Sequence, residues 1–310
     1  MIKVVFMGTP EFSVPVLKGL IEDSNYEVVG VVSQPDKKVG RHQILTPSPI
    51  SQVALDNGIN LLRIEKIRTN YQEVLDLKPD MIITCAYGQI IPKEILDYPK
   101  YGCINVHASL LPKLRGGAPI HRSIIEGYKE TGITIMYMDE GMDTGDIISQ
   151  RKIEILDSDT VETLHDKLSV IGRELLLETL PNIISGNINR IKQNPDEVTF
   201  AYNIKREDEH LDFNKTSREI FNHVRGLNSF PGAFCLLEGK VIKVYDGKIG
   251  TSTKGSCGEI TNIYSDGIGV KCSDKEYIIT ELKVEGKKKC SAREYLNGKK
   301  KEDLLGKKFE

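Results

Sequence analysis

Short apolar runs alternate with amphipathic segments in the first part of the chain. Ile2–Met7 and Tyr26–Ser33 are rich in β-branched residues and are typical of buried strands. Between them, apolar residues recur at helical spacing from Phe12 to Leu20. A strand, a helix and a strand at this spacing form a βαβ unit with parallel strands. We therefore expect an α/β fold with a doubly wound, Rossmann-like parallel sheet.

The alternation of strand-like and helical segments continues up to Ser185 and is later replaced by a series of short strands. Further strands are expected at Ile59–Leu62, Asp80–Ala86, Gly132–Met138 and Ile147–Ile155. Helices are expected at Ile50–Asn57, Tyr71–Leu77, Pro119–Glu126 and Thr160–Ser185. Beyond residue 205 the pattern becomes one of short strands with frequent turn signals, which indicates a small β-barrel. We expect a catalytic domain at 1–188, a linker at 189–205 and a C-terminal domain at 206–310.

Composition narrows the class of protein. The 310 residues are 39% hydrophobic and 28% charged, and no apolar run approaches the ~18 residues of a membrane span. The N-terminal run resembles a first strand rather than a signal peptide, so we expect a cytoplasmic protein. The six cysteines form no C-x-x-C pair, so neither a zinc site nor a disulfide framework is indicated.

Charge is distributed unevenly along the chain. Residues 1–200 carry a net charge of −6, whereas residues 201–310 carry +4. The basic excess is strongest around Lys287, Lys288 and Lys289. A basic surface on an otherwise acidic protein suits a polyanion such as RNA, although lysine-rich segments also serve solubility alone.

A second basic segment, Gln34–Pro49, follows the second strand. It is long for a βα connection and contains Lys37, Lys38 and Arg41. It could be a solvated loop or a phosphate-binding one. A dinucleotide site near this opening is disfavoured, because Gly8 stands without the G-x-G-x-x-G pattern.

The strongest candidate chemistry lies in the stretch Tyr101–Pro119. Asn105 and His107 are two residues apart, so an extended backbone directs both side chains to one face. Asparagine can donate hydrogen bonds to an oxyanion, and histidine can move a proton near neutral pH. A purely structural hydrogen-bonded pair is the alternative.

An acidic loop at positions 138–146 could supply a carboxylate to orient the imidazole. Spacing does not choose among Asp139, Asp143 and Asp146. The calcium-loop spacing D-x-D-x-D-G is missing, so no metal is expected.

The string INVHASLLPKLRGGAP together with the acidic loop resembles the signature of the folate-dependent formyltransferases. The resemblance runs from Lys3 to about Leu296. It implies transfer of a formyl group from 10-formyltetrahydrofolate to methionine esterified to an initiator tRNA. It also implies a second domain that is OB-like and binds tRNA. We expect the protein to be a monomer.

The resemblance also implies roles for single residues. Asn105, His107 and Asp143 match the catalytic positions, and Arg41 matches the central arginine of a tRNA-binding insertion with Lys37 and Lys38. Lys287, Lys288 and Lys289 are expected to add tRNA contacts. The expected folate-binding residues are Tyr87, Gly88, Gln89, Ile90, Ser109, Leu110, Leu111, Pro112 and Asp139.

Two rival functions share parts of this pattern. A formyltransferase for a small acceptor, such as an amino-sugar nucleotide, would use the same three catalytic residues but would not need the basic segments. A non-catalytic RNA-binding protein would not need the catalytic residues.

Overall fold

The structure, a computed structural model, describes residues 1–40 and 42–310. The chain forms two compact units. The first unit comprises Met1–Pro119, Glu130–Glu154 and His165–Tyr202. The second unit comprises Ile120–Lys129, Ile155–Leu164 and Asn203–Glu310. Among the described residues, no helix is both long enough and apolar enough to span a bilayer.

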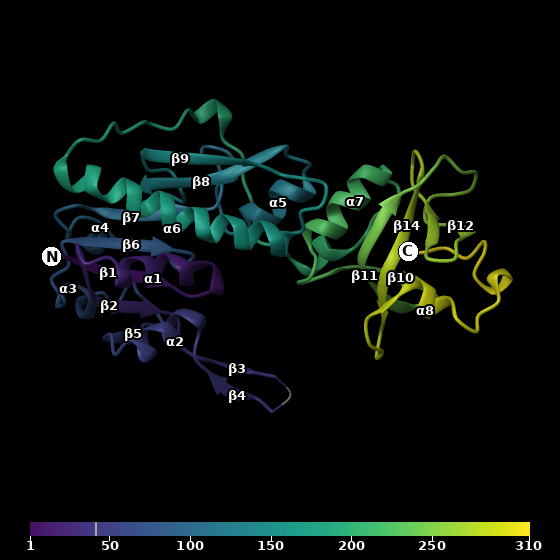
Figure 1. Ribbon diagram of the computed structural model, residues 1–310, viewed down its shortest axis with the longest axis horizontal. Coiled ribbons are helices and arrows are strands. Elements are labelled where there is room, and N and C mark those ends of the chain that lie inside the picture. The colour runs from purple at the N-terminus through teal and green to yellow at the C-terminus, as the bar shows by residue number, and fades with distance from the viewer. Residues whose placement is uncertain (41) are drawn as a thin grey trace. The chain divides into compact units, whose positions relative to one another are not determined.

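A seven-stranded sheet forms the centre of the first unit (Figure 1). Its order is β5-β2-β1-β6-β7-β8-β9. The strands are β1 (Ile2–Gly8), β2 (Tyr26–Ser33), β5 (Leu61–Arg63), β6 (Met81–Cys85), β7 (Cys103–His107), β8 (Glu130–Tyr137) and β9 (Ile147–Glu154). The first five of these pair in parallel. The expected α/β fold with a parallel-rich sheet is confirmed.

The sheet differs from the expected one at one edge and in the basic segment. β8 runs antiparallel to β7, and β9 antiparallel to β8, so the expected parallel sheet has an antiparallel edge. A hydrophobic run specifies a strand but not its direction. The segment expected as a loop at Gln34–Pro49 contains a short exposed ladder of β3 (Lys37–Val39) and β4 (Ile44–Thr46).

β1 is an interior strand of this sheet and lies between β2 and β6. Residues Val4–Met7 have no exposed surface, because both faces of this strand are covered. The helices of the first unit are α1 (Val14–Glu22), α2 (Pro49–Asp56), α3 (Gln72–Leu75), α4 (Lys93–Leu96) and most of α6 (Val161–Ser185), with 3₁₀ turns at Glu11–Ser13 and Pro195–Glu197. α6 packs beside α1, where Arg173 donates to Glu22 at 2.6 Å (Figure 1).

The second unit is built on an antiparallel sheet of order β10-β11-β14-β13-β12, with β15 beside β14. Its strands are β10 (Ala233–Leu237), β11 (Lys240–Ile249), β12 (Ile260–Ile263), β13 (Ile268–Lys271), β14 (Glu276–Val284) and β15 (Cys290–Ser291). Its helices are α5 (Pro119–Ile125), α7 (Ser217–Gly226) and α8 (Ala292–Leu296), with 3₁₀ turns at Arg206–Glu209 and Lys301–Asp303. The expected series of short strands is confirmed.

The end of the chain binds both edges of this second sheet. Leu236 of β10 exchanges two backbone hydrogen bonds with Glu310, and Ile260 of β12 donates to the carbonyl of Lys307. These bonds satisfy backbone groups that an open sheet edge leaves unpaired. The C-terminal residues are therefore a structural part of this unit.

Candidate active site

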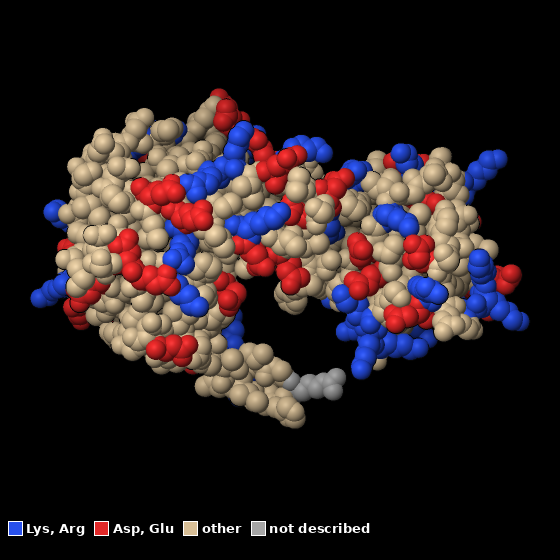
Figure 2. Space-filling model, viewed as in Figure 1, with Lys and Arg blue, Asp and Glu red and all other residues tan. Residues whose placement is uncertain are grey.

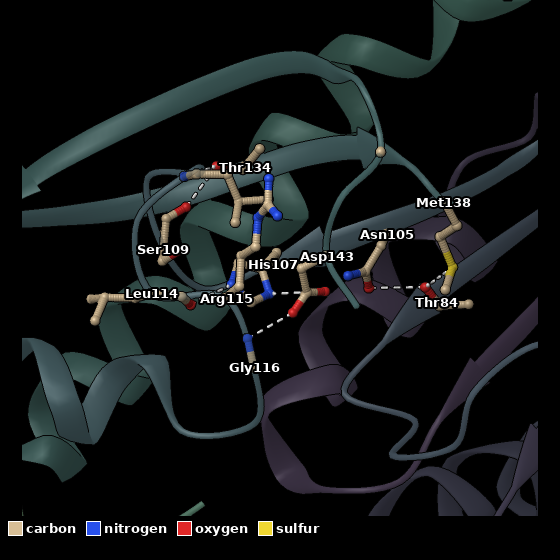
Figure 3. A network of polar contacts seen from close by, with 12 residues as sticks. Thr84, Asn105, His107, Ser109, Leu114, Arg115, Gly116, Thr134, Met138 and Asp143 are labelled. Carbon is tan, nitrogen blue, oxygen red and sulfur yellow. Dashed lines mark hydrogen bonds and ion pairs between the residues drawn. The ribbon is translucent and has the colours of Figure 1, made fainter. Parts of the chain in front are cut away.

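The polar centre of the first unit begins at β7. Asn105 and His107 lie two residues apart on this strand, and the His107 side chain is only 7% exposed. In register with Asn105 on the neighbouring β6, Thr84 donates from Oγ1 to Asn105 Oδ1 at 2.9 Å. This bond occupies the amide oxygen and leaves the amide N–H groups as donors. In Figure 3 the amide nitrogen points to the side on which Asp143 lies.

His107 lies between two acceptors. Its Nε2 is 3.1 Å from the carbonyl oxygen of Leu114, and its Nδ1 is 3.6 Å from Oδ1 of Asp143 (Figure 3). A carbonyl oxygen carries no hydrogen, so Nε2–H must donate to Leu114. In the neutral ring Nδ1 then carries a lone pair that faces a carboxylate. A proton carried at Nδ1 would instead face that carboxylate.

Asp143 is held by backbone on the loop after β8. Its Oδ2 accepts from the N–H of Gly116 at 2.8 Å, and its φ of 55° is one that aspartate tolerates better than most residues. The loop returns tightly to β8, since a Cβ at Gly145 would lie 1.9 Å from the carbonyl oxygen of Tyr137. Glycine is therefore required at position 145.

The three acids that spacing could not separate have different partners. Asp139 accepts from Gly141 N and Thr144 Oγ1 within its own turn, at 3.0 and 2.5 Å. Asp146 pairs with Arg190 at 3.0 Å. Asp143 is the acid that the structure brings to His107.

Gln193, which the sequence analysis missed, joins the two loops around His107. Its Nε2 donates to the carbonyls of Asp143 and Gly145, both at 2.8 Å. Its Oε1 accepts two bonds from the Arg115 guanidinium, at 3.0 and 2.7 Å. No sequence pattern near Gln193 could have revealed this, because its partners lie about fifty residues or more away in the chain.

Leu114 is the second residue that the sequence did not indicate. It has a φ of 59°, which is unusual for a bulky residue, and its N–H donates to Thr199 Oγ1 at 2.8 Å. Strained backbone of this kind is common at functional sites, where the surroundings hold it in place. Here the held residue supplies the carbonyl that fixes His107.

The expected folate residues after β7 form a turn with its own hydrogen bonds. Ser109 Oγ donates to the carbonyl of Lys113 at 2.7 Å, and Leu111 N–H donates to Thr134 Oγ1 at 3.1 Å. Gln150 also donates to Leu111 O, at 2.9 Å. Leu111 is buried, whereas Leu110 and Pro112 are half-buried. Much of the polar backbone here is thus already used to hold the turn.

The expected folate residues after β6 are more varied. Gln89 uses its side chain to hold Ile64 O and Ile67 N, whereas Ile90 is 61% exposed. Gly88 has a φ of 82° and makes the turn. Tyr87 is buried, which raises its pKa to about 12, and its hydroxyl has no hydrogen-bond partner among the described residues. The Tyr87 side chain packs in the hydrophobic core of this unit, so its hydroxyl is not exposed at the surface of the turn.

The expected tRNA-binding lysines are on the surface. Lys37 and Lys38 are exposed on β3, while Arg41 lies outside the described residues. Lys287, Lys288 and Lys289 are exposed after β14, and Lys289 pairs with Glu281 at 2.9 Å. Figure 2 shows lysine and arginine side chains gathered on part of the visible face of the second unit. Both regions could contact phosphates.

Fold and site together define an α/β transferase whose amide, imidazole and carboxylate surround one position. This chain belongs to the formyl transferase family. The family model described as formyl transferase matches residues 2–180, and the model of the formyl transferase C-terminal domain matches residues 203–300.

Curated relatives and solved structures agree with this assignment. Methionyl-tRNA formyltransferases from Bacillus cereus strains G9842 and B4264 are each 55% identical over 306 residues, which is 97% of both chains. An N-formyltransferase from Helicobacter canadensis has a similar fold, with a TM-score of 0.69, 22% identity, and coverage of 90% of this chain and 98% of its own. Methionyl-tRNA formyltransferase from Clostridium thermocellum has a TM-score of 0.57 at 19% identity, with coverage of 81% and 94%.

Proposed function

We propose that this protein is a methionyl-tRNA formyltransferase. It transfers the formyl group of 10-formyltetrahydrofolate to the amino group of methionine on initiator tRNA. The curated relatives that are 55% identical over 97% of the chain support this acceptor. The observation that carries the chemistry is His107, which lies between Leu114 O and Asp143 with Asn105 two residues away on β7.

Asn105, His107 and Asp143 are the proposed catalytic residues. The neutral amine of methionine adds to the formyl carbon, and an α-amino group with a pKa near ~8 supplies enough neutral form. Asn105 N–H and the His107 imidazolium stabilise the resulting oxyanion. On collapse, the bond from that carbon to the folate nitrogen breaks, and the proton lost by the amine passes to that nitrogen. Asp143 stabilises the cationic ring.

Folate is proposed to bind between the turns after β6 and β7. The half-buried and exposed members, such as Leu110 and Ile90, can contact the ring system, while Tyr87 is proposed to contribute through its backbone. The other proposed contacts come from Gly88, Gln89, Ser109, Leu111, Pro112 and Asp139. The glutamine and serine side chains already hold the turns, so backbone groups are their expected contribution.

The proposed tRNA contacts are Lys37, Lys38, Arg41 and Lys287–Lys289. The proposed domains are catalytic at 1–188, a linker at 189–205, and an OB-like tRNA-binding barrel at 206–310. The terminal residues that bind both edges of the second sheet support a barrel-like closure. The protein is proposed to act as a monomer in the cytoplasm, where charged tRNA is used.

Formyl transfer from labelled 10-formyltetrahydrofolate tests this proposal. Methionyl initiator tRNA, free methionine and an amino-sugar nucleotide serve as parallel acceptors. We expect transfer to the tRNA alone, and Asn105→Asp should lower kcat by ~10²–10³ because it loses the N–H donors. Asn105→Asp can still accept from Thr84, so the β6–β7 contact survives. Transfer only to the sugar nucleotide would overturn the acceptor.

A further inference from the structure

Two aromatic rings are exposed side by side at the end of the first unit's last segment. Phe200 and Tyr202 stack with ring centroids 5.6 Å apart and ring planes 12° from parallel. Their exposed fractions are 45% and 62%. Single exposed aromatics are common, but a stacked and exposed pair presents a flat apolar surface that water solvates poorly.

The backbone under this pair is fixed to the loop that holds the catalytic residues. Arg115 donates to Thr199 O at 2.9 Å, Ala201 donates to Arg115 O at 2.7 Å, and Ala118 donates to Ala201 O at 3.0 Å. The approach is close, since a Cβ on Gly116 would lie 2.8 Å from the carbonyl oxygen of Ala201. The rings therefore extend from a segment that has little freedom to move.

This fixed backbone also connects the pair to the loop that contacts His107 and Asp143. The carbonyl of Leu114 accepts from His107, and the N–H of Gly116 donates to Asp143. Both residues belong to the loop to which Ala201 is hydrogen-bonded. A group that stacks on the pair would be held by a segment hydrogen-bonded to the loop that contacts His107 and Asp143.

We propose that Phe200 and Tyr202 form a stacking platform for the unpaired bases at the 3′ end of the tRNA. The proposal rests on the proposed function, in which methionine is esterified to the terminal ribose. The bases next to that ribose must therefore lie close to His107 whenever the methionine reaches it. Aromatic platforms suit such bases because every base has a flat π face, whatever its sequence. Pre-stacked rings lose little conformational freedom on binding.

Binding of two uncharged tRNAs tests the platform separately from catalysis. One is full-length, and the other lacks its unpaired 3′ nucleotides. Wild-type protein should bind the full-length tRNA more tightly. In a Phe200→Leu/Tyr202→Leu double variant, which keeps apolar bulk but lacks rings, affinity for full-length tRNA should fall about tenfold or more. Affinity for the truncated tRNA should not change.

Control variants separate stacking from other effects. Phe200→Tyr and Tyr202→Phe keep both rings and should bind as wild type does. Tyr98→Ala removes another exposed tyrosine of the first unit, which is 43% exposed and precedes β7, and it should have no effect. Thermal unfolding of the double variant should match wild type, because both side chains are exposed.

Three results would overturn the platform. They are an unchanged affinity of the double variant for full-length tRNA, an equal loss for both tRNAs, and a loss in the ring-preserving variants. The wild-type formyl-transfer assay distinguishes this failure from failure of the proposed function. If wild-type protein formylates methionyl-tRNA and the double variant does so with an unchanged KM, only the platform is wrong.

Discussion

Two buried histidines, one in each unit, share almost every local property. His107 and His223 are 6% and 7% exposed. Each ring donates from Nε2 to a backbone carbonyl, that of Leu114 at 3.1 Å and that of Asp208 at 2.7 Å. They differ in what acts on the ring besides this bond. Oδ1 of Asp143 lies 3.6 Å from Nδ1 of His107. For His223, burial is the largest influence, and it lowers the pKa of the ring.

On the proposed mechanism, burial alone does not make a histidine catalytic. Desolvation favours the neutral ring, as at His223, where the positive charge of Lys215 acts in the same direction. At His107 a carboxylate lies beside the second nitrogen, where it can pair with the positive charge that the ring carries when it stabilises an oxyanion. His223 therefore serves as a structural control for His107.

The largest expected effect comes from replacing each ring by glutamine. The glutamine amide can still donate to the carbonyl that each ring contacts, but it cannot carry a proton. His107→Gln should lower kcat by ~10²–10⁴ because general acid–base catalysis is lost. His223→Gln should leave kcat near the wild-type value.

Single-turnover transfer to methionyl-tRNA, at saturating folate and tRNA, is the measurement for this pair. Circular dichroism of both variants controls for misfolding. Equal losses in the two variants would mean that the contrast between the histidines is not catalytic.

A smaller loss is expected when only the charge beside His107 is removed. Asp143→Asn keeps an oxygen that can accept from Gly116 N–H, so the loop should persist. The carboxylate lies 3.6 Å from Nδ1, within ion-pair range, and losing its charge should lower kcat by about 10- to 100-fold, equivalent to ~1.4–2.8 kcal/mol. The KM for folate and the melting temperature should change little. An unchanged kcat would show that the ring functions without its carboxylate.

The next effect in size separates two glutamines whose Nε2 groups each donate two hydrogen bonds. Gln193 donates to the carbonyls of Asp143 and Gly145, whereas Gln150 donates to Leu111 O and Thr134 Oγ1. Gln193→Ala frees the loop that positions Asp143, so kcat should fall about tenfold if two bonds of ~0.5–1.5 kcal/mol are lost.

Gln150→Ala serves as the matched control for Gln193→Ala. It loosens the turn at Leu111, so it should raise the KM for folate and largely spare kcat. Steady-state kinetics with each substrate varied will distinguish the two variants. Identical profiles would indicate that both glutamines serve only the stability of the fold.

The sequence predicted the elements of this site better than the contacts between them. Strand positions follow from local hydrophobic pattern, which is why the strand expected at Ile147–Ile155 coincides with β9 at Ile147–Glu154. The two-residue spacing of Asn105 and His107 on one strand is also local. The direction of β8 depends on its pairing with β7, and the pattern of one strand carries no information about that pairing.

The contacts around His107 depend on chain segments that are far apart in sequence. Gly116 and Asp143 are 27 residues apart, and Gln193 lies 50 residues beyond Asp143. Leu114 contributes a backbone carbonyl at a φ of 59°, which its side-chain type gives no reason to expect. Family resemblance could indicate Asp143, but only the fold brings the Leu114 carbonyl to the His107 ring and brings Gly116 and Gln193 to Asp143.

The smallest expected effect is on stability and belongs to His223. Because burial lowers the pKa of the folded His223, the unfolded chain binds a proton more readily. Its contribution to the free energy of unfolding is complete above the unfolded pKa of ~6.5 and is lost as pH falls toward the folded pKa. Lys215 and Arg122 favour this direction, while the Asp208 contacts oppose it.

Urea unfolding of wild type and His223→Gln between pH 7.5 and 5 is the measurement. The variant has no ring to protonate and can still donate to Asp208 O, so its stability should fall less steeply below pH ~6.5. Carboxylates such as Asp208, whose pKa is lowered mainly by the backbone N–H of Lys205, contribute equally to both proteins and cancel in the difference. Parallel curves would mean that His223 is protonated as easily in the fold as outside it, and the contrast with His107 would then lose its electrostatic basis.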